Sequence, residues 1–116
     1  MNGFLQVSTT TDSEDEARRI AAPLVDRRLA ACAQIVGPIT SVYRWKGKVE
    51  TAGEWLCLIK TTSATYDDLE AAIREMHSYE VPEIVAVPLC AGSSDYLDWL
   101  KGQVNACHEP DGNRFT

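Results

Sequence analysis

The stretch AQIVGPITSVYRWKGKVETAGEWLCLI, residues 33–59, decides the fold of this chain of 116 residues. Residues 33–45 read as a long strand, and Gly37-Pro38 within it predicts a bulge or bend because proline cannot donate to a sheet ladder. The sequence Lys46-Gly47-Lys48 predicts a turn. The continuous apolar run at residues 55–59 then predicts a returning strand that is buried on both faces. The two strands therefore form a long hairpin.

The segments before the hairpin predict a strand followed by a helix. Residues 3–9 have the apolar body of a strand, and Thr11-x-x-Glu14 has the spacing of a capping box at a helix start. Apolar residues then recur every three or four positions up to Leu29, which is the pattern of one helical face. Pro23 removes one backbone hydrogen bond inside this helix, so we expect a kink or break near residues 19–23.

The segments after the hairpin predict a second helix, a strand and a third helix. Residues 64–77 carry an apolar stripe at helical spacing, and Ser63 or Thr65 supplies a cap. Residues 83–87 read as a strand. The third helix starts at residues 92–95, and we expect its inward face to carry Tyr96, Leu97, Leu100 and Val104.

The order of these elements predicts the α+β class. Two split βαβ units make a ferredoxin-like βαββαβ sandwich, in which a four-stranded sheet has two helices on one face. The third helix follows this sandwich as a C-terminal helix. We expect one domain over residues 1–104 and a polar, mobile tail over residues 105–116.

Composition and charge exclude several classes of protein. The 11 Lys and Arg and 17 Asp and Glu give a net charge of −6, which argues against nucleic acid as a partner because a phosphate backbone needs a basic face. No run approaches the roughly 18 apolar residues of a membrane span, and no signal peptide is recognisable. The four cysteines show neither a disulfide framework nor a C-x-x-C pattern. We therefore expect a cytoplasmic protein with reduced thiols.

Residues with catalytic or metal-binding chemistry are few. The patterns G-x-S-x-G, H-E-x-x-H and the P-loop are missing, and nothing forms a nucleophile–base pair, so we expect no enzyme activity. His77 ends the second predicted helix, where a histidine is either favoured by the helix dipole or available as a metal ligand. Glu80 and Glu83 are close enough in sequence to add oxygen ligands. Cys107-His108-Glu109 is a weaker candidate, because adjacent side chains rarely all reach one ion.

Aromatic side chains favour association between subunits. Most of the aromatic mass comes from Tyr43, Trp45, Trp55, Tyr79 and Trp99. Such side chains either line a pocket or become buried against another subunit. The hairpin tip, roughly residues 43–54, is expected to extend beyond the core of a single subunit. We therefore favour an oligomer over a monomer with scattered surface aromatics.

An ordered set of segments resembles the CutA family of divalent-cation tolerance proteins. The segments are Arg28-Leu29-Ala30-Ala31-Cys32, Ser41-Val42-Tyr43-Arg44-Trp45-Lys46-Gly47-Lys48, Leu58-Ile59-Lys60-Thr61, Tyr79-Glu80-Val81-Pro82-Glu83-Ile84 and Tyr96-Leu97-Asp98-Trp99-Leu100. The resemblance extends from about residue 5 to residue 104. It implies a ferredoxin-like fold and a tight homotrimer, in which the long hairpin pairs with neighbouring subunits and joins their sheets edge to edge.

The resemblance also implies a role in tolerance to copper and other divalent ions, with weak metal binding and no required cofactor. Metal ligands attributed to the family are a cysteine at the end of the first strand and two adjacent histidines. Thr9 and Met76 occupy two of these positions here, whereas His77 retains the third. Cys32 matches a cysteine that is common in the family. The candidate metal ligands are therefore His77 and Cys32.

An alternative function follows from the same resemblance. The family trimer is similar to the PII signalling proteins, whose ligands occupy clefts between subunits. This similarity implies a regulatory trimer that binds a small molecule or a protein. The candidate residues for such a cleft are Lys60, Trp45, Tyr79 and Glu83.

Overall fold

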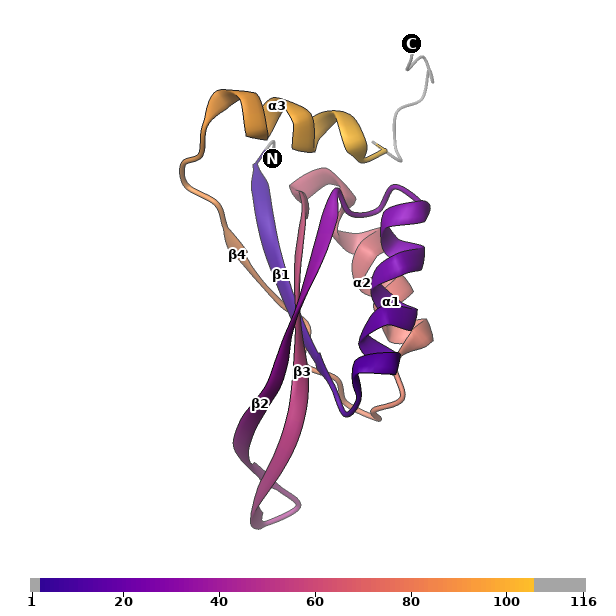
Figure 1. The fold of residues 1–116 in the computed structure, drawn as a ribbon, viewed down its shortest axis with the longest axis vertical. Coiled ribbons are helices and arrows are strands. Elements are labelled where there is room, and N and C mark those ends of the chain that lie inside the picture. Colours follow the sequence, from indigo (N-terminus) through magenta and orange to yellow (C-terminus); the bar gives the residue numbers. More distant parts are fainter. Residues whose placement is uncertain (1–2, 106–116) are drawn as a thin grey trace.

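A computed structural model describes residues 3–105 and has one four-stranded antiparallel sheet. Its elements are β1 (Phe4–Thr11), α1 (Glu14–Asp26), β2 (Cys32–Trp45), β3 (Lys48–Thr62), a 3-10 helix (Ser63–Thr65), α2 (Tyr66–Met76), β4 (Val85–Pro88) and α3 (Ser94–Gln103). The strand order is β2-β3-β1-β4, with α1 and α2 beside the sheet and α3 across its end (Figure 1). The predicted α+β class is confirmed. Of the predicted tail, only Asn105 is described, and its N–H donates to the Arg28 carbonyl at 2.9 Å. Residues 106–116, with Cys107-His108-Glu109, lie outside the described residues.

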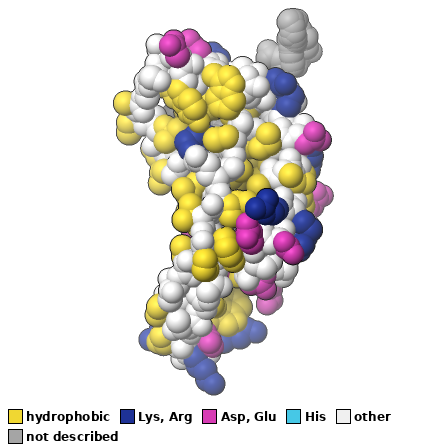
Figure 2. Space-filling view, viewed as in Figure 1, with side chains coloured by type: hydrophobic (Ala, Val, Ile, Leu, Met, Phe, Trp, Pro, Cys, Tyr) yellow, Lys and Arg dark blue, Asp and Glu magenta, His cyan; other side chains and the backbone are white. Residues whose placement is uncertain are grey.

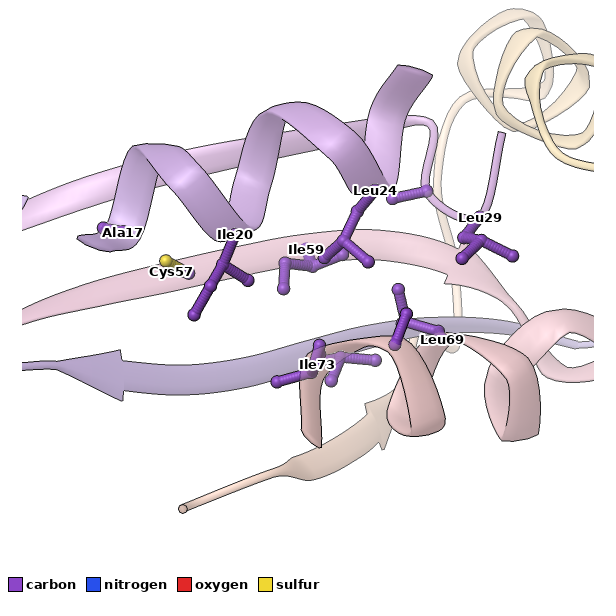
Figure 3. Close-up of a cluster of buried hydrophobic side chains, with 11 residues drawn as sticks. Ala17, Ile20, Leu24, Leu29, Cys57, Ile59, Leu69 and Ile73 are labelled. Atoms are coloured by element: carbon purple, nitrogen blue, oxygen red, sulfur yellow. The ribbon is translucent and has the colours of Figure 1, made fainter. Parts of the chain in front are cut away.

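The hydrophobic core lies between the two helices and one face of the sheet (Figure 3). The strands contribute every second residue to it, and the helices contribute the apolar stripes that their sequences predict. Its largest fully buried aliphatic side chains are Val7, Ile20, Leu24, Ile59, Leu69 and Ile73. Burial of each such side chain stabilises the fold by about 2 kcal/mol.

The start of α1 differs from the prediction. β1 continues to Thr11, which pairs with Trp55, so Thr11 is still part of the sheet and does not cap the helix. Ser13 is the N-cap instead, and its side chain accepts a hydrogen bond from the Glu16 N–H at 3.1 Å. The predicted Thr11-x-x-Glu14 capping box is therefore wrong, and the N-cap lies two residues later than predicted.

The predicted break in α1 is also wrong. The helix continues through Pro23 to Asp26. Proline removes one hydrogen bond, and the carbonyl that loses its partner belongs to Arg19. Arg19 is exposed, so water can satisfy this carbonyl while the apolar face of the helix stays packed on the core.

The hairpin has the predicted bend and turn. β2 and β3 pair from Cys32 to Trp45, with a shift in register between Val36 and Ile39 around the cis Gly37-Pro38 bond. Lys46 and Gly47 form a two-residue turn with φ angles of 51° and 83°. Positive φ at both positions is the geometry of a type I′ turn, which matches the twist of the flanking strands and favours glycine.

The prediction that β3 is buried on both faces is wrong. Cys57, Ile59 and Thr61 face the helices and are buried, whereas Leu56 and Leu58 on the opposite face are only half-buried. The apolar run does not alternate, so its pattern does not reveal that helices cover one face only. The opposite face of the sheet therefore keeps apolar surface exposed in a single subunit.

Smaller corrections concern the segments after the hairpin. α2 begins at Tyr66 after the 3-10 helix, and neither Ser63 nor Thr65 caps it with its side chain. In α3, Leu100 is buried as predicted, but Tyr96 is 40% exposed. Across residues 3–105, no helix has the length and apolar character needed to span a bilayer.

Replacing Gly37 tests the packing of the hairpin. A Cβ atom at Gly37 would lie 2.6 Å from Cδ2 of Trp55, whereas a Cβ atom at Gly53 meets nothing within 4 Å. We predict that Gly37→Ala lowers the free energy of unfolding by about 1–3 kcal/mol. Gly53→Ala, the matched control on the partner strand, changes it by about 0.5 kcal/mol or less. Urea denaturation measures both values, and equal effects of the two variants would contradict this packing.

Candidate functional site

A cavity of about 740 Å³ lies between the hairpin and the loop that follows α2. Ser41, Tyr43 and Trp45 alternate along β2 and reach it from one face of the strand. Its aromatic lining consists of Tyr43, Trp45 and Tyr79, and its carboxylates are Glu54, Glu80 and Glu83. Within the described part of the chain, no Lys or Arg lines it. The cavity is therefore aromatic and negatively charged.

A buried polar cluster attaches this loop to α1. The Glu16 carboxylate accepts hydrogen bonds from the Ser78 backbone N–H at 2.8 Å and from the Ser78 hydroxyl at 3.0 Å. Glu16 reaches the loop because the helix starts at Ser13, which directs the first turn of α1 towards residues 77–79. Two charge-assisted hydrogen bonds to one carboxylate fix the start of the loop.

The His77 ring attaches the same loop to β1. Its Nδ1 accepts a hydrogen bond from the Tyr79 N–H at 3.1 Å, so the ring proton lies on Nε2, which donates to the Thr10 carbonyl at 2.7 Å. The His77 side chain is fully buried, and Nδ1 lies 3.6 Å from Glu16 Oε2. Both ring nitrogens therefore take part in the fold.

Tyr79 connects the loop to the hairpin. Its hydroxyl donates to Glu54 Oε2 at 2.6 Å. Burial, the hydrogen bond to Glu54 and the negative charge of Glu54 raise the pKa of Tyr79 well above its ordinary value. Tyr79 therefore stays protonated and keeps donating to Glu54 at every pH at which the protein is normally studied.

Three of the four predicted cleft residues meet in this cavity. Trp45, Tyr79 and Glu83 all line it. Lys60 does not, because it lies further along β3, opposite Cys32, where its Nζ donates to Gln34 Oε1 at 2.9 Å.

The two predicted metal ligands lie apart. His77 contacts Thr10, which pairs with Leu56, whereas Cys32 pairs with Lys60. Four residues of β3 separate these two positions, which corresponds to about 13 Å. Cys32 Sγ instead lies 3.7 Å from the Tyr96 hydroxyl. One ion therefore cannot contact both residues within a subunit.

A closed metal centre is not formed by one subunit in its described part. Residues 3–105 contain no group of three or more His, Cys, Asp or Glu side chains placed to hold an ion. Burial raises the pKa of the Cys57 thiol to about 11, so this cysteine stays protonated and is a poor ligand.

Sequence reasoning missed Glu16, Ser78 and Glu54. The Ser13-x-x-Glu16 spacing was a second capping signal that pointed to the first of these residues. Glu54 carried a weaker signal, since it is a charged residue directly before the apolar run of β3. Ser78 had none, because a serine after a helix is usually read as part of a turn.

The Glu16 cluster makes stability depend on pH. Burial alone would raise the pKa of Glu16, but the two hydrogen bonds from Ser78 are the main opposing cause, and the pKa is held below its ordinary value. A carboxyl whose pKa is lowered by folding stabilises the protein above its unfolded pKa, and this stabilisation is lost as the pH falls through the folded value.

We predict that Glu16→Gln lowers the free energy of unfolding at neutral pH. We also predict that this free energy then decreases less steeply as the pH falls. Urea unfolding at a series of pH values measures both effects. Glu14→Gln, in the same helical turn but at an exposed ion pair with Arg18, should keep the acid slope of the unaltered protein. An unchanged slope in Glu16→Gln would refute the role of this carboxylate.

Similarity to known proteins covers nearly all of the described chain. The family model described as CutA1 divalent ion tolerance protein matches residues 5–103. The chain is 48% identical over 95 residues to the divalent-cation tolerance protein CutA of Thermus thermophilus, covering 82% of this chain and 92% of that protein. It is 41% identical over 95 residues to the rice protein CutA 1, chloroplastic, covering 82% of this chain but only 54% of that longer protein.

A solved structure has the same fold. The structure of the divalent cation tolerance protein (Cut A1) from Thermus thermophilus superposes with a TM-score of 0.86 at 45% identity, covering 88% of this chain and 99% of that one. All residues that line the cavity lie within the residues 5–103 that the family model matches. The chain therefore belongs to the CutA1 family of divalent ion tolerance proteins.

Proposed function

We propose that the protein acts in divalent-cation tolerance and binds a divalent ion such as copper weakly, as cargo rather than as a resident cofactor. The observation that carries this proposal is the charge of the cavity. Glu54, Glu80 and Glu83 line it without a Lys or Arg among the described lining residues. A cleft of one sign of charge concentrates ions of the opposite sign.

We propose His77 as the nitrogen contact for the ion and one carboxylate, Glu80 or Glu83, as the oxygen contact. His77 uses both ring nitrogens in the fold, so an ion gains a nitrogen ligand only by displacing the Tyr79 N–H or the Thr10 carbonyl. This competition supports weak binding. Because Cys32 lies about 13 Å away along the sheet, we propose the carboxylates rather than Cys32 as partners of His77.

Calorimetric titration with Cu²⁺ and Zn²⁺ tests this proposal. We predict measurable heat for the unaltered protein and a clear reduction for His77→Ala, with circular dichroism to verify that the variant is folded. His108→Ala removes the only other histidine of the chain and serves as the matched control, which should bind normally. Equal heats for the unaltered protein and His77→Ala would remove His77 from the site.

We further propose that the subunit is a ferredoxin-like sandwich that assembles into a homotrimer. The βαββαβ succession and the strand order support the first part. Exposed apolar side chains support the second, since Val42 and Val49 on the hairpin are 66% and 64% exposed. Val85 and Val87 on the edge strand β4 are also exposed. Side chains of this kind, clustered on strands at sheet edges, are typical of surfaces that another chain covers.

Sedimentation equilibrium tests the trimer. We predict a mass about three times the 12.8 kDa of one chain. Val42→Asp places a charge on the hairpin surface and should weaken association. Val25→Asp, a partly exposed position on α1, is the matched control and should leave the trimer intact. A mass of one chain for the unaltered protein would contradict assembly.

Ligand binding similar to that of the PII proteins is the second candidate function. It is favoured by the cavity, which brings Trp45, Tyr79 and Glu83 together in a volume suited to a small molecule. We propose that this cavity becomes a cleft between subunits in the trimer, because residues 41–45 that line it belong to the hairpin, and the hairpin projects beyond the rest of the sheet (Figure 1).

The cellular setting is part of the proposal. We propose a reducing, cytoplasmic location, which the free thiols of Cys32, Cys57 and Cys90 support. We also propose that the protein is not an enzyme. The engagement of both His77 nitrogens in structural hydrogen bonds supports this, because a general base needs a free nitrogen.

A further inference from the structure

Glu54 is a buried carboxylate without a balancing cation. The residue is 7% exposed, and within residues 3–105 no Lys, Arg or His forms an ion pair with it. In this part of the chain, the Tyr79 hydroxyl is its one hydrogen-bond donor. Its second oxygen has no side-chain donor in this part of the chain and is not sealed from solvent, so it is open to a further partner. A buried charge of this kind is costly unless a group of opposite charge pairs with it.

The surroundings of Glu54 suit an organic cation. Tyr43, Trp45 and Tyr79 present aromatic surface, and a cation near such a ring is attracted by its negative face. Glu80 and Glu83 add negative charge at the same cavity. Charge and apolar surface therefore occur together, as recognition of an organic cation requires.

A bare metal ion matches the Glu54 end of the cavity less well. The three carboxylates are not close enough to form a ligand set within the described residues. The cavity of about 740 Å³ has the volume of small-molecule sites, far more than one ion fills. The unused oxygen of Glu54 needs a single positive group with its own hydrogen-bond donors, which an ammonium or guanidinium supplies.

We propose that this cavity binds a small organic cation, a protonated amine or guanidinium, whose charge pairs with Glu54 and whose carbon body packs on Tyr79, the ring whose hydroxyl is bonded to Glu54. The inference rests on the second candidate function above, ligand binding in this cavity. It adds the charge and chemical class of the ligand and assigns Glu54 as the anchoring residue.

A second copy of the chain could also supply an ammonium or guanidinium group, from the lysine and arginine side chains of its hairpin. Arg44, Lys46 and Lys48 give the hairpin tip a positive charge, which Figure 2 shows at the lower end of the molecule. Lys46 Nζ already lies 5.6 Å from the centroid of the Trp45 ring. The experiment must therefore separate a small molecule from a neighbouring hairpin.

Nuclear magnetic resonance titration with phenethylamine provides the test, with the backbone N–H signals of residue 54 and Tyr79 as the readout in the assembled protein. We expect a saturable shift at millimolar concentrations and none with phenethyl alcohol, which has the same shape without the charge. Glu54→Gln keeps an acceptor for Tyr79 and should weaken binding about tenfold or more. Asp98→Asn, an exposed carboxylate on α3 outside the cavity, should bind as the unaltered protein does.

The outcomes distinguish this inference from the proposed functions. The comparison of amine with alcohol on the unaltered protein stands even if Glu54→Gln does not fold. The inference is overturned if the protein binds the amine and the alcohol equally, or binds neither. If calorimetric titration with Cu²⁺ still gives heat in that case, the metal proposal stands. Dissociation of the oligomer in Glu54→Gln, without any amine binding to the unaltered protein, would assign Glu54 to a neighbouring hairpin instead.

Discussion

The length of the hairpin is the constraint on which the rest of the structure depends. β2 and β3 have 14 and 15 residues, whereas β1 has 8 and pairs with β3 only from Trp55 to Thr62. Beyond Trp55, towards the turn, the two strands have only each other as partners within residues 3–105. The helices cover one face of the shared sheet, so the projecting strands lack a layer on which to bury Val42 and Val49. This surface supports assembly, and the hairpin forms one wall of the cavity.

The other wall depends on a buried polar cluster rather than on apolar packing. Glu16 holds Ser78, His77 bonds to Thr10 and Tyr79, and Tyr79 in turn reaches Glu54 across the cavity. In the Glu16–His77 part of this network both carboxylate oxygens and both ring nitrogens are paired. Such a satisfied network specifies one arrangement, because each unpaired buried group would be costly. His77 is thus first a structural residue, and metal binding at its ring competes with the fold. That competition explains why weak binding of an ion as cargo suits this site better than a resident metal centre.

Periodic patterns made most of the fold predictable. The apolar stripes of both core helices, the bend at Gly37-Pro38 and the turn after Trp45 follow from local chemistry, and the structure confirms them. The helix start was missed because Thr11 and Ser13 both suit a cap, and pairing in the sheet decides between them. The burial of residues 55–59 was misread because an apolar run does not say which face a helix covers. Glu54 became a candidate only once the Tyr79 loop was seen opposite it, which is tertiary information.

The central claim is that neighbouring subunits complete the projecting hairpin. Hydrogen exchange of individual backbone amides in the native protein tests this claim most directly. β2 is an edge strand, so every second amide over residues 39–45 points away from β3 and has no strand partner within the described residues of one subunit. If neighbouring strands cover this edge, these amides will exchange as slowly as those of the central strand β1. Exchange at the rate of an unstructured peptide would contradict the account.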